Sequence, residues 1–386
     1  MGKKKIAYIN PLILKWGRMR TPKTTIKISG KIIEKEQLEK WENGEEDISI
    51  NEAKELAKIY GIPFAAMYLS KIPADDNTTY TDRRTYKDNI DDKESYSLWK
   101  EINRMKACRE NALEFIDIFE YENALNRFRT QEKDTRKISD EVREIFKINT
   151  PFKNKSSYGD KAFMYYRNLM ERKGIIVLQI EGIDVIEIRG LSLNYDVLPI
   201  IAVNKNDSDR AKVFTIIHEL CHLIRRTSNL CLIEDDTRED KEEKECNKLA
   251  AEILMPEKIF REEINKIDIY KDEDLEKISD KFAVSKFVII KRLYDLKIIS
   301  YNIYEEMYNE NQEKYEQYVL TKQKNKKKNV PISRDITFVS QNGYLYPRIV
   351  LNAYYEGKAS FGEVCNIFNV GSKYIDGIER MVMKNE

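Results

Sequence analysis

The spacing of apolar and polar positions predicts a mainly helical protein with a small group of strands in the middle of the chain. Helices are expected where apolar residues recur every three or four positions, and strands where short β-branched runs are bounded by turn residues. The helical pattern covers residues 33–41, 50–60, 96–129, 161–172, 210–226, 239–255, 274–281 and 286–296. The β-branched runs are residues 175–180, 185–188 and 198–203. We therefore expect an α+β fold in which helical N- and C-terminal regions flank a small mixed sheet.

Composition and charge exclude some broad classes of protein. Among 386 residues, 67 Lys and Arg face 66 Asp and Glu, so the net charge of +1 gives no overall attraction to nucleic acid or membrane. No segment has the roughly 18 consecutive apolar residues that a membrane span needs. Asn10, Pro11 and Lys15 interrupt the apolar start, which argues against a signal peptide. Five scattered cysteines argue against a secreted disulfide framework, so the cytoplasm is the expected location.

One predicted helix, RAKVFTIIHELCHLIRR, contains the pattern HExxH. His218 and His222 are four residues apart, so both imidazoles project from one face of a helix and can bind one metal ion. Glu219 lies about 100° around the helix from His218, where it can act as general base on a metal-bound water without being a ligand. These are the only two histidines in the chain, which argues against a chance match. The motif predicts catalytic zinc; manganese is the alternative, because imidazole and carboxylate accept both ions.

A catalytic zinc site needs a third protein ligand, and the next predicted helix offers carboxylates. The sequence EDKEEKECNKLAAEILMP contains Glu242, Glu243 and Glu245. Glu243 is followed four residues later by Asn247 on the same helix face, which suits a ligand beside a residue that hydrogen-bonds the outer nitrogen of a histidine. Spacing alone supports this interpretation of Glu243 about as well as a solvated acidic face.

The segment from Tyr158 to Pro256 resembles the ImmA/IrrE metallopeptidases (the DUF955 family) and, in its ligand plan, the wider thermolysin-like gluzincins. The resemblance rests on IIAVN, RAKVFTIIHELCH and EKECNKLAAEILMP. At these places the family typically reads close to VN, R..FTLAHELGH and E..AN.FAAELLMP. The resemblance implies a gluzincin-like core in which Glu243 is the third ligand. Cys221 stands where the family usually has glycine and Cys246 where it usually has alanine; we expect two buried cysteines, with a thiol-sensitive site as the alternative.

The resemblance also implies a strand beside the cleft that binds substrate. In that frame the edge strand consists of Ile200, Ile201, Ala202 and Val203, and an extended peptide pairs with its backbone. Thermolysin-like sites often bind the developing oxyanion with a separate histidine, and this chain has no third histidine. The donor is then a tyrosine, arginine, lysine, amide or main-chain N–H, and Tyr195 is the candidate.

The N-terminal sequence LEKWENGEEDISINEAKELAKIYGIPFAAMYL resembles the end of an XRE-type helix-turn-helix. Its presumptive recognition stretch, IEKEQLEKWENGEE, is rich in glutamate, which opposes docking on phosphates. We therefore favour a degenerate module that contacts protein over one that binds DNA. The lysine run KQKNKKKN is interpreted as a solvated linker, with nucleic-acid contact as the alternative. The predicted regions are the degenerate module at 1–75, a linker and long helix at 76–150, a zinc metallopeptidase domain at 151–300, and a helical C-terminal region with the lysine-rich linker at 301–386.

Three classes of function are compatible with these motifs. The first, favoured by the resemblance, is a zinc endopeptidase that makes site-specific cuts in a protein substrate, an XRE-type or phage-type transcriptional repressor. The second is a DNA-binding transcriptional regulator with a structural or sensory metal site, and the third is a protein-interaction scaffold without activity. The intact Glu219 favours the first, because a structural metal site needs no general base. The complete HExxH pattern and Glu243 count against the third.

Overall fold

The computed structural model describes residues 5–22, 25–73, 92–117, 124–128, 134–152, 161–225, 229–231, 241–324 and 332–384. The chain divides into two compact units, Met1–Ala107 and Cys108–Glu386, and the boundary falls within helix α4 (Asp92–Leu113). The expected long helix at 96–129 ends at Leu113, and a 3₁₀ turn, η2 (Ala124–Phe128), follows. Nearly all of the predicted linker at 74–92, and most of the lysine run at 322–329, lie outside the described residues.

The first unit combines three short helices with a two-stranded hairpin. Helices α1 (Pro11–Arg20), α2 (Lys35–Asn43) and α3 (Ile50–Ile59) pack around a common core with strands β1 (Ile26–Ile28) and β2 (Lys31–Ile33) and the 3₁₀ turn η1 (Phe64–Tyr68). The side chains of Ser49 and Glu52 form a capping box that starts α3. Gly44, with a φ of 73°, ends α2. The hairpin between α1 and α2 was not predicted from the sequence pattern.

The second unit contains a four-stranded mixed sheet in the order β3-β5-β4-β6. Strand β3 (Ile176–Ile180) is parallel to β5 (Ile200–Asn204), and β4 (Gly190–Leu193) is antiparallel to both β5 and β6 (Asn229–Cys231). The α+β, mainly helical fold with a small mixed sheet is therefore confirmed. The prediction that Ile200, Ile201, Ala202 and Val203 form an edge strand is wrong: β5 is hydrogen-bonded on both sides and fully buried.

The predicted strand at residues 185–188 is also wrong, because this segment is a turn. Asp184 Oδ1 accepts a hydrogen bond from Ile186 N, and the Asp184 carbonyl accepts from Glu187 N and Ile188 N. The buried Asn204 side chain donates to the carbonyls of Ile183 and Ile188. These local hydrogen bonds outweigh the strand preference of β-branched residues, and the true strand begins at Gly190.

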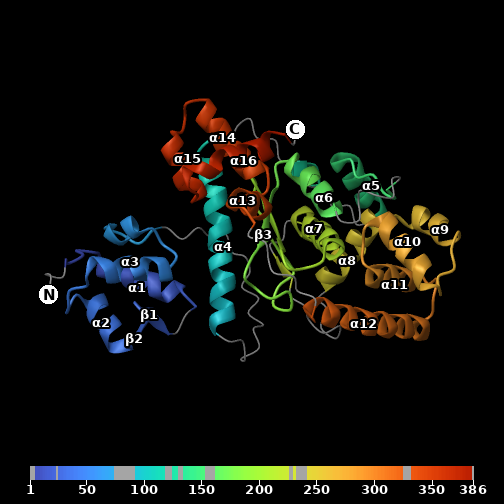
Figure 1. The fold of residues 1–386 in the computed structure, drawn as a ribbon, viewed down its shortest axis with the longest axis horizontal. Helices are drawn as coiled ribbons and strands as arrows, with labels where there is room; N and C mark the ends of the chain where they lie inside the picture. Colours follow the sequence, from blue (N-terminus) through green and yellow to red (C-terminus); the bar gives the residue numbers. More distant parts are fainter. Residues whose placement is uncertain are drawn as a thin grey trace. The chain divides into compact units, whose positions relative to one another are not determined.

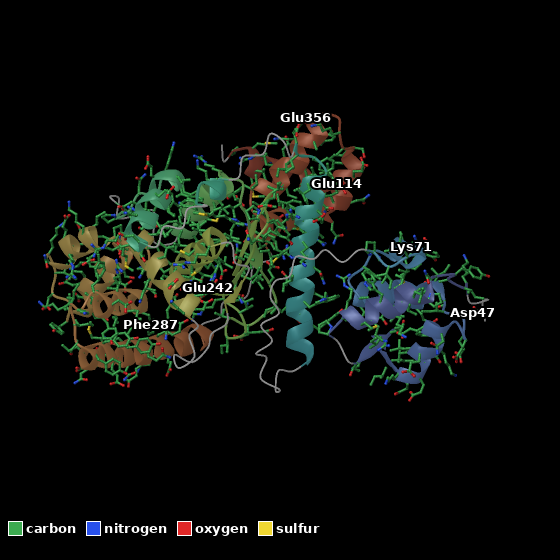
Figure 2. The ribbon with its side chains drawn as sticks, turned by 180° about the vertical axis from the view of Figure 1, so that it is seen from behind. Asp47, Lys71, Glu114, Glu242, Phe287 and Glu356 are labelled. Carbon is green, nitrogen blue, oxygen red and sulfur yellow. The ribbon has the colours of Figure 1, made fainter. Side chains whose placement is uncertain are left out.

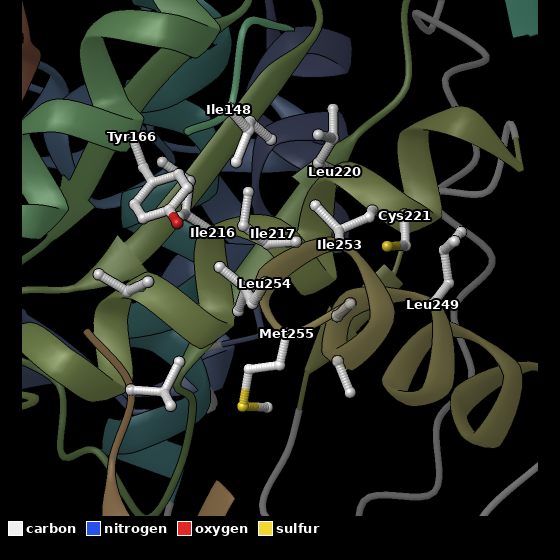
Figure 3. Packing of buried hydrophobic residues seen from close by; sticks show 14 of the residues in the cluster. Ile148, Tyr166, Ile216, Ile217, Leu220, Cys221, Leu249, Ile253, Leu254 and Met255 are labelled. Carbon is white, nitrogen blue, oxygen red and sulfur yellow. The ribbon is translucent and has the colours of Figure 1, made fainter. Parts of the chain in front are cut away.

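Helix α7 (Asp209–Ile224) packs on β4 and β5 and is enclosed by α6 (Ala162–Glu171) and α8 (Lys241–Leu254). Helix α8 packs in turn on α5 (Thr135–Phe146). Ile216, Ile217 and Leu220 of α7 interdigitate with Ile253 and Leu254 of α8 in the centre of the core (Figure 3). The two predicted helices of the motif region thus form the core of this unit, within a few residues of the expected bounds.

Two arginines satisfy the carbonyl groups at the end of α8. Arg143 Nη1 donates to Ile253 O at 2.6 Å and to Thr150 Oγ1 at 2.7 Å, while Thr150 Oγ1 donates to Leu254 O. Arg292 donates to Met255 O at 2.9 Å and forms a buried ion pair with Glu252. Because the last carbonyls of a helix have no partner within it, these contacts fix the position of α8.

The remaining helices cover the periphery of the second unit. Helices α9 (Glu257–Ile264), α10 (Asp272–Phe282), α11 (Lys286–Asp295) and α12 (Tyr301–Lys324) follow α8, and a C-terminal group comprises α13 (Arg334–Asn342), α14 (Leu345–Tyr355), α15 (Phe361–Phe368) and α16 (Ile375–Met383) (Figure 1). The buried Arg167 of α6 donates to Val177 O on β3 and to Ser340 O on α13. The buried Glu171 accepts from Tyr344 N. These polar contacts attach the C-terminal group to α6 and β3. Among the described residues, no helix is both long and apolar enough to cross a membrane.

Candidate metal centre

Helix α7 carries the HExxH motif through the interior of the protein. Ser208 caps the helix, with Oγ accepting a hydrogen bond from Ala211 N. Every residue from Thr215 to Ile224 is buried. His218, Glu219 and His222 are 1%, 0% and 0% exposed, respectively. The motif therefore lies inside the core, where water is scarce and side chains have little freedom to move.

The two histidines and Glu243 converge on one point. His218 Nε2 and His222 Nε2 are 3.0 Å apart. Glu243 Oε2 lies 3.1 Å from His218 Nε2, and Glu243 Oε1 lies 3.2 Å from His222 Nε2. The three residues form a group that can hold a metal ion, with ligand atoms all within 4.8 Å of one another. The structure thus brings together the three residues that the sequence predicts as ligands.

The spacing of these atoms fits a small tetrahedral ion. With Zn–N and Zn–O bonds near 2.05 Å and tetrahedral angles, two ligand atoms stand about 3.3 Å apart. The two imidazole nitrogens are 3.0 Å apart, and they lie 3.1 and 3.2 Å from the two different oxygens of Glu243, so the group is compact enough for an ion of this size. An ion with ligands at 2.3–2.6 Å, such as calcium, would need wider spacing and more oxygen donors. Two imidazoles and one carboxylate are also the donor set that zinc uses in HExxH sites.

Glu243 is held in the charged form that a ligand needs. Burial alone would raise the pKa of its carboxyl, but the hydrogen bonds from His218 and His222 hold that pKa well below its usual range. Glu243 lies in the first turn of α8, where the positive end of the helix dipole also favours a negative charge. The carboxylate is therefore ready to bind a cation without first losing a proton.

The outer nitrogen of His222 faces α8. Its Nδ1 lies 3.6 Å from Cys246 Sγ and 3.6 Å from Glu242 Oε1 (Glu242 is labelled in Figure 2). If Nε2 binds the metal, Nδ1 carries the proton and donates toward these two groups. In the described part of the chain, Asn247 forms no hydrogen bond with either histidine. Cys246 and Glu242 thus occupy the position beside His222 that the sequence analysis assigned to Asn247.

The two cysteines near the motif, Cys221 and Cys246, are buried and form no disulfide. Burial raises the pKa of Cys221 well above its ordinary value, with a smaller contribution from Cys246. Burial likewise raises the pKa of Cys246. Neither cysteine belongs to the group of residues whose ligand atoms converge, which consists of His218, His222 and Glu243.

Gly190 allows the sheet to approach Glu219 closely. A Cβ on Gly190 of β4 would stand 3.0 Å from Glu219 Oε1 and would overlap Thr215 Cγ2. Glu219 is therefore positioned against the bare backbone of β4, with its carboxylate on the side of α7 that faces the sheet. The sequence analysis missed Gly190. A glycine within a short apolar strand was the available signal, since it often marks close backbone approach.

Glu245 and Tyr195 serve other contacts. Glu245 Oε2 accepts from Arg225 Nη1 at 2.6 Å, which ties the end of α7 to α8. The role of Tyr195 as oxyanion donor stays a prediction. The Tyr195 ring is covered by the guanidinium of Arg109, 3.7 Å from its centroid.

A buried helix with two histidines, a glutamate from the next helix and an adjacent carboxylate base is the arrangement of an HExxH metallopeptidase site. Comparison with protein families agrees: residues 171–294, from the end of α6 to α11, match the model of the IrrE N-terminal-like domain, a family of peptidases (Peptidase_M78). The match supports the ImmA/IrrE resemblance and indicates a peptidase, with metal dependence typical of that family. The comparisons with curated proteins and with solved structures gave no match.

Proposed function

We propose that the protein is a zinc-dependent endopeptidase that makes site-specific cuts in a protein substrate. The observation that carries this proposal is the convergence of His218, His222 and Glu243, with Glu219 on the same buried helix. Manganese is the alternative ion, because the donor set accepts it. A structural or sensory site in a DNA-binding regulator would need the three ligands but not a general base beside them.

The residues of the site have distinct roles in peptide hydrolysis. His218, His222 and Glu243 would hold the metal, which when bound supplies a Lewis acid that brings the pKa of a water ligand to about 7. Glu219 takes the proton that water loses as it adds to the scissile carbonyl carbon. Glu219 then returns a proton to the leaving nitrogen as the C–N bond breaks. Burial of Glu219 against Gly190 restricts its carboxylate to one orientation for both transfers.

Substrate pairing belongs at the outer edge of the sheet rather than on β5. Strand β5 has hydrogen-bonded neighbours on both sides and cannot accept a further strand. Among the strands of the described residues, β6 ends the sheet beside β4, and its Cys231 pairs with Gly190, the residue next to Glu219. An extended peptide that pairs with the outer edge of β6 would therefore lie at the end of the sheet where β4 meets Glu219.

We further propose that the substrate is an XRE-type or phage-type repressor, and that its cleavage acts as a regulatory switch in the cytoplasm. This substrate class is what the ImmA/IrrE resemblance implies, and the match to the IrrE N-terminal-like domain supports the peptidase assignment alone. The first unit, or the region at 96–129, would dock the partner. The glutamate-rich stretch in α2 favours protein contact over DNA contact. The described cysteines Cys108, Cys221, Cys246 and Cys365 are free thiols, which suits a reducing compartment.

The test is incubation of the purified protein with a repressor encoded next to its gene. We expect two discrete repressor fragments from the wild type, none from Glu219→Gln, and little digestion of casein. Zinc content measured on both proteins should be the same, because Glu219 is not a ligand. DNA binding by the protein, with no cleavage by metal-loaded wild type, would instead favour the regulator with a structural metal site.

A further inference from the structure

A cavity of about 230 Å³ lies between α10, α11 and α12. The residues of this part of the second unit take no part in the proposed peptide hydrolysis. Helix α12 runs beside α11 (Figure 1). The floor is apolar, formed by Leu275, Ile290, Ile303 and Met307. The cavity is smaller than the 300–1,000 Å³ of drug-sized ligand sites, so its size suits one long side chain rather than a cofactor.

A buried amide opens into this cavity. Asn311 lines it and is only 8% exposed. It lies on α12, which packs on α11. Its amide offers one acceptor and two donors to a group that enters the cavity.

The rim of the cavity carries an excess of negative charge. Asp272, Glu306 and Glu310 line it together with Lys314, and Lys286, outside the lining, also pairs with Asp272 at 3.1 Å. Lys314 Nζ contacts Glu310 Oε1 at 2.7 Å and Asp272 Oδ1 at 3.3 Å. Within the described chain Glu306 has no ion-pair partner. Tyr270, 67% exposed, adds an aromatic ring to the rim.

We propose that this cavity binds an arginine side chain of the protein substrate and so acts as a docking site apart from the metal centre. The aliphatic stem of arginine fits the apolar floor, and its planar fork of five N–H donors can reach an amide oxygen and a carboxylate together. Asn311 Oδ1 and the Glu306 carboxylate are the acceptors, and Tyr270 offers its face to the cation. The role in substrate docking rests on the proposed function; binding of the side chain does not.

Binding is tested without any peptidase activity, by titrating Nα-acetyl-arginine amide into full-length protein with ¹³C-labelled methionine methyl groups. The chain has 10 methionines, and Met307→Leu assigns the signal from the cavity floor. We expect a saturable shift of the Met307 methyl signal, with a Kd on the order of 1 mM. The citrulline analogue lacks the positive charge and the lysine analogue lacks the planar fork of donors. Both should therefore shift the Met307 signal much less.

Glu306→Gln should weaken arginine binding about fivefold, as expected for one exposed charge contact. Asn311→Leu should abolish it. Glu313→Gln, an exposed glutamate of the same helix outside the cavity, is the matched control and should leave binding unchanged. Equal shifts with citrulline or lysine, or no saturation with arginine, would overturn the proposal while leaving the metal centre untouched. Repressor cleavage by Glu306→Gln should then show a raised KM with kcat unchanged.

Discussion

Gly190 in β4 and Glu219 in α7 are in direct contact: a Cβ on the glycine would stand 3.0 Å from Glu219 Oε1. The same Cβ would overlap Thr215 Cγ2, one turn earlier on α7. The absence of a side chain at one position of the sheet thus sets how closely the catalytic helix approaches it.

Gly190→Ala should destabilise the protein by about 1–3 kcal/mol, as overpacking of a tight core does. Thr215→Ser removes the methyl group that the new Cβ would meet first, so the double variant should recover much of the lost stability. Activity should recover less, because the contact with Glu219 remains. Chemical denaturation and repressor cleavage measure the two effects. A Gly190→Ala protein with wild-type stability and activity would contradict the close approach.

Each of the three converging side chains should be needed for metal binding. His218→Ala, His222→Ala and Glu243→Ala should each lose most of the zinc, since two remaining ligands cannot complete a tetrahedral site. Glu245→Ala is the matched control on α8, because Glu245 contacts Arg225 and not the histidines. The zinc content of each purified protein, determined by metal analysis, tests this prediction. Equal zinc loss in Glu245→Ala would mean that the α8 register is not as described.

Cys246 should influence the metal through His222 without binding it. Cys246→Ala removes a group 3.6 Å from His222 Nδ1 and should lower zinc affinity by up to about tenfold, the low end for loss of a ligand's hydrogen-bond partner. Cys246→Ser keeps an acceptor and should retain more affinity. Asn247→Ala should have no effect. Competition with a zinc chelator measures the zinc affinity of each variant. A larger loss of affinity in Asn247→Ala than in Cys246→Ala would support the role that the sequence analysis assigned to Asn247.

Stability should fall as pH rises toward neutrality because of Glu171. Burial raises the pKa of Glu171 to about 7 from an ordinary value of 4.5, although the Arg167 guanidinium and the N–H of Tyr344 oppose this. Between pH 4.5 and pH 7 the folded state therefore binds more protons than the unfolded state, and raising pH lowers the free energy of unfolding, by up to about 1.4 kcal/mol per pH unit. The full stabilising contribution of protonated Glu171 is present below pH 4.5.

Glu171→Gln should remove this component of the pH dependence. Denaturant titrations of wild type and variant at several pH values between 4.5 and 7.5 isolate it as the difference between the two curves. Glu313→Gln, at an exposed residue of α12, serves as a control for loss of one carboxylate. Parallel curves for wild type and Glu171→Gln would show that Glu171 is ionised throughout this range.

Much of the site could be predicted from sequence because its ligands obey local rules. His218, Glu219 and His222 follow from helix periodicity alone, and Glu243 from the resemblance of the EKECNKLAAEILMP segment. Asn247 was assigned by spacing on one helix, but the face of α8 that meets His222 depends on how two helices pack. Cys246 and Glu242 occupy that face, which no single-helix pattern reveals.

The sheet was harder to predict, because strand order is a property of the whole fold. The run at Ile200–Asn204 was correctly expected to be a strand, but nothing in its composition distinguishes a central strand from an edge strand beside a cleft. The turn at 183–188 reflects hydrogen bonds from Asn204, sixteen or more residues away. Long-range contacts of this kind outweigh local propensity and have no signature in one sequence.

The burial of α7 means that the HExxH residues and the hydrophobic core share one helix. Between His218 and His222 stand Glu219, Leu220 and Cys221, all fully buried. Any substitution that shifts this helix to relieve a packing defect must also shift the imidazoles. Random mutagenesis should therefore yield many variants that fold at low temperature yet lose activity on mild warming, with lesions scattered through the core rather than gathered at the metal.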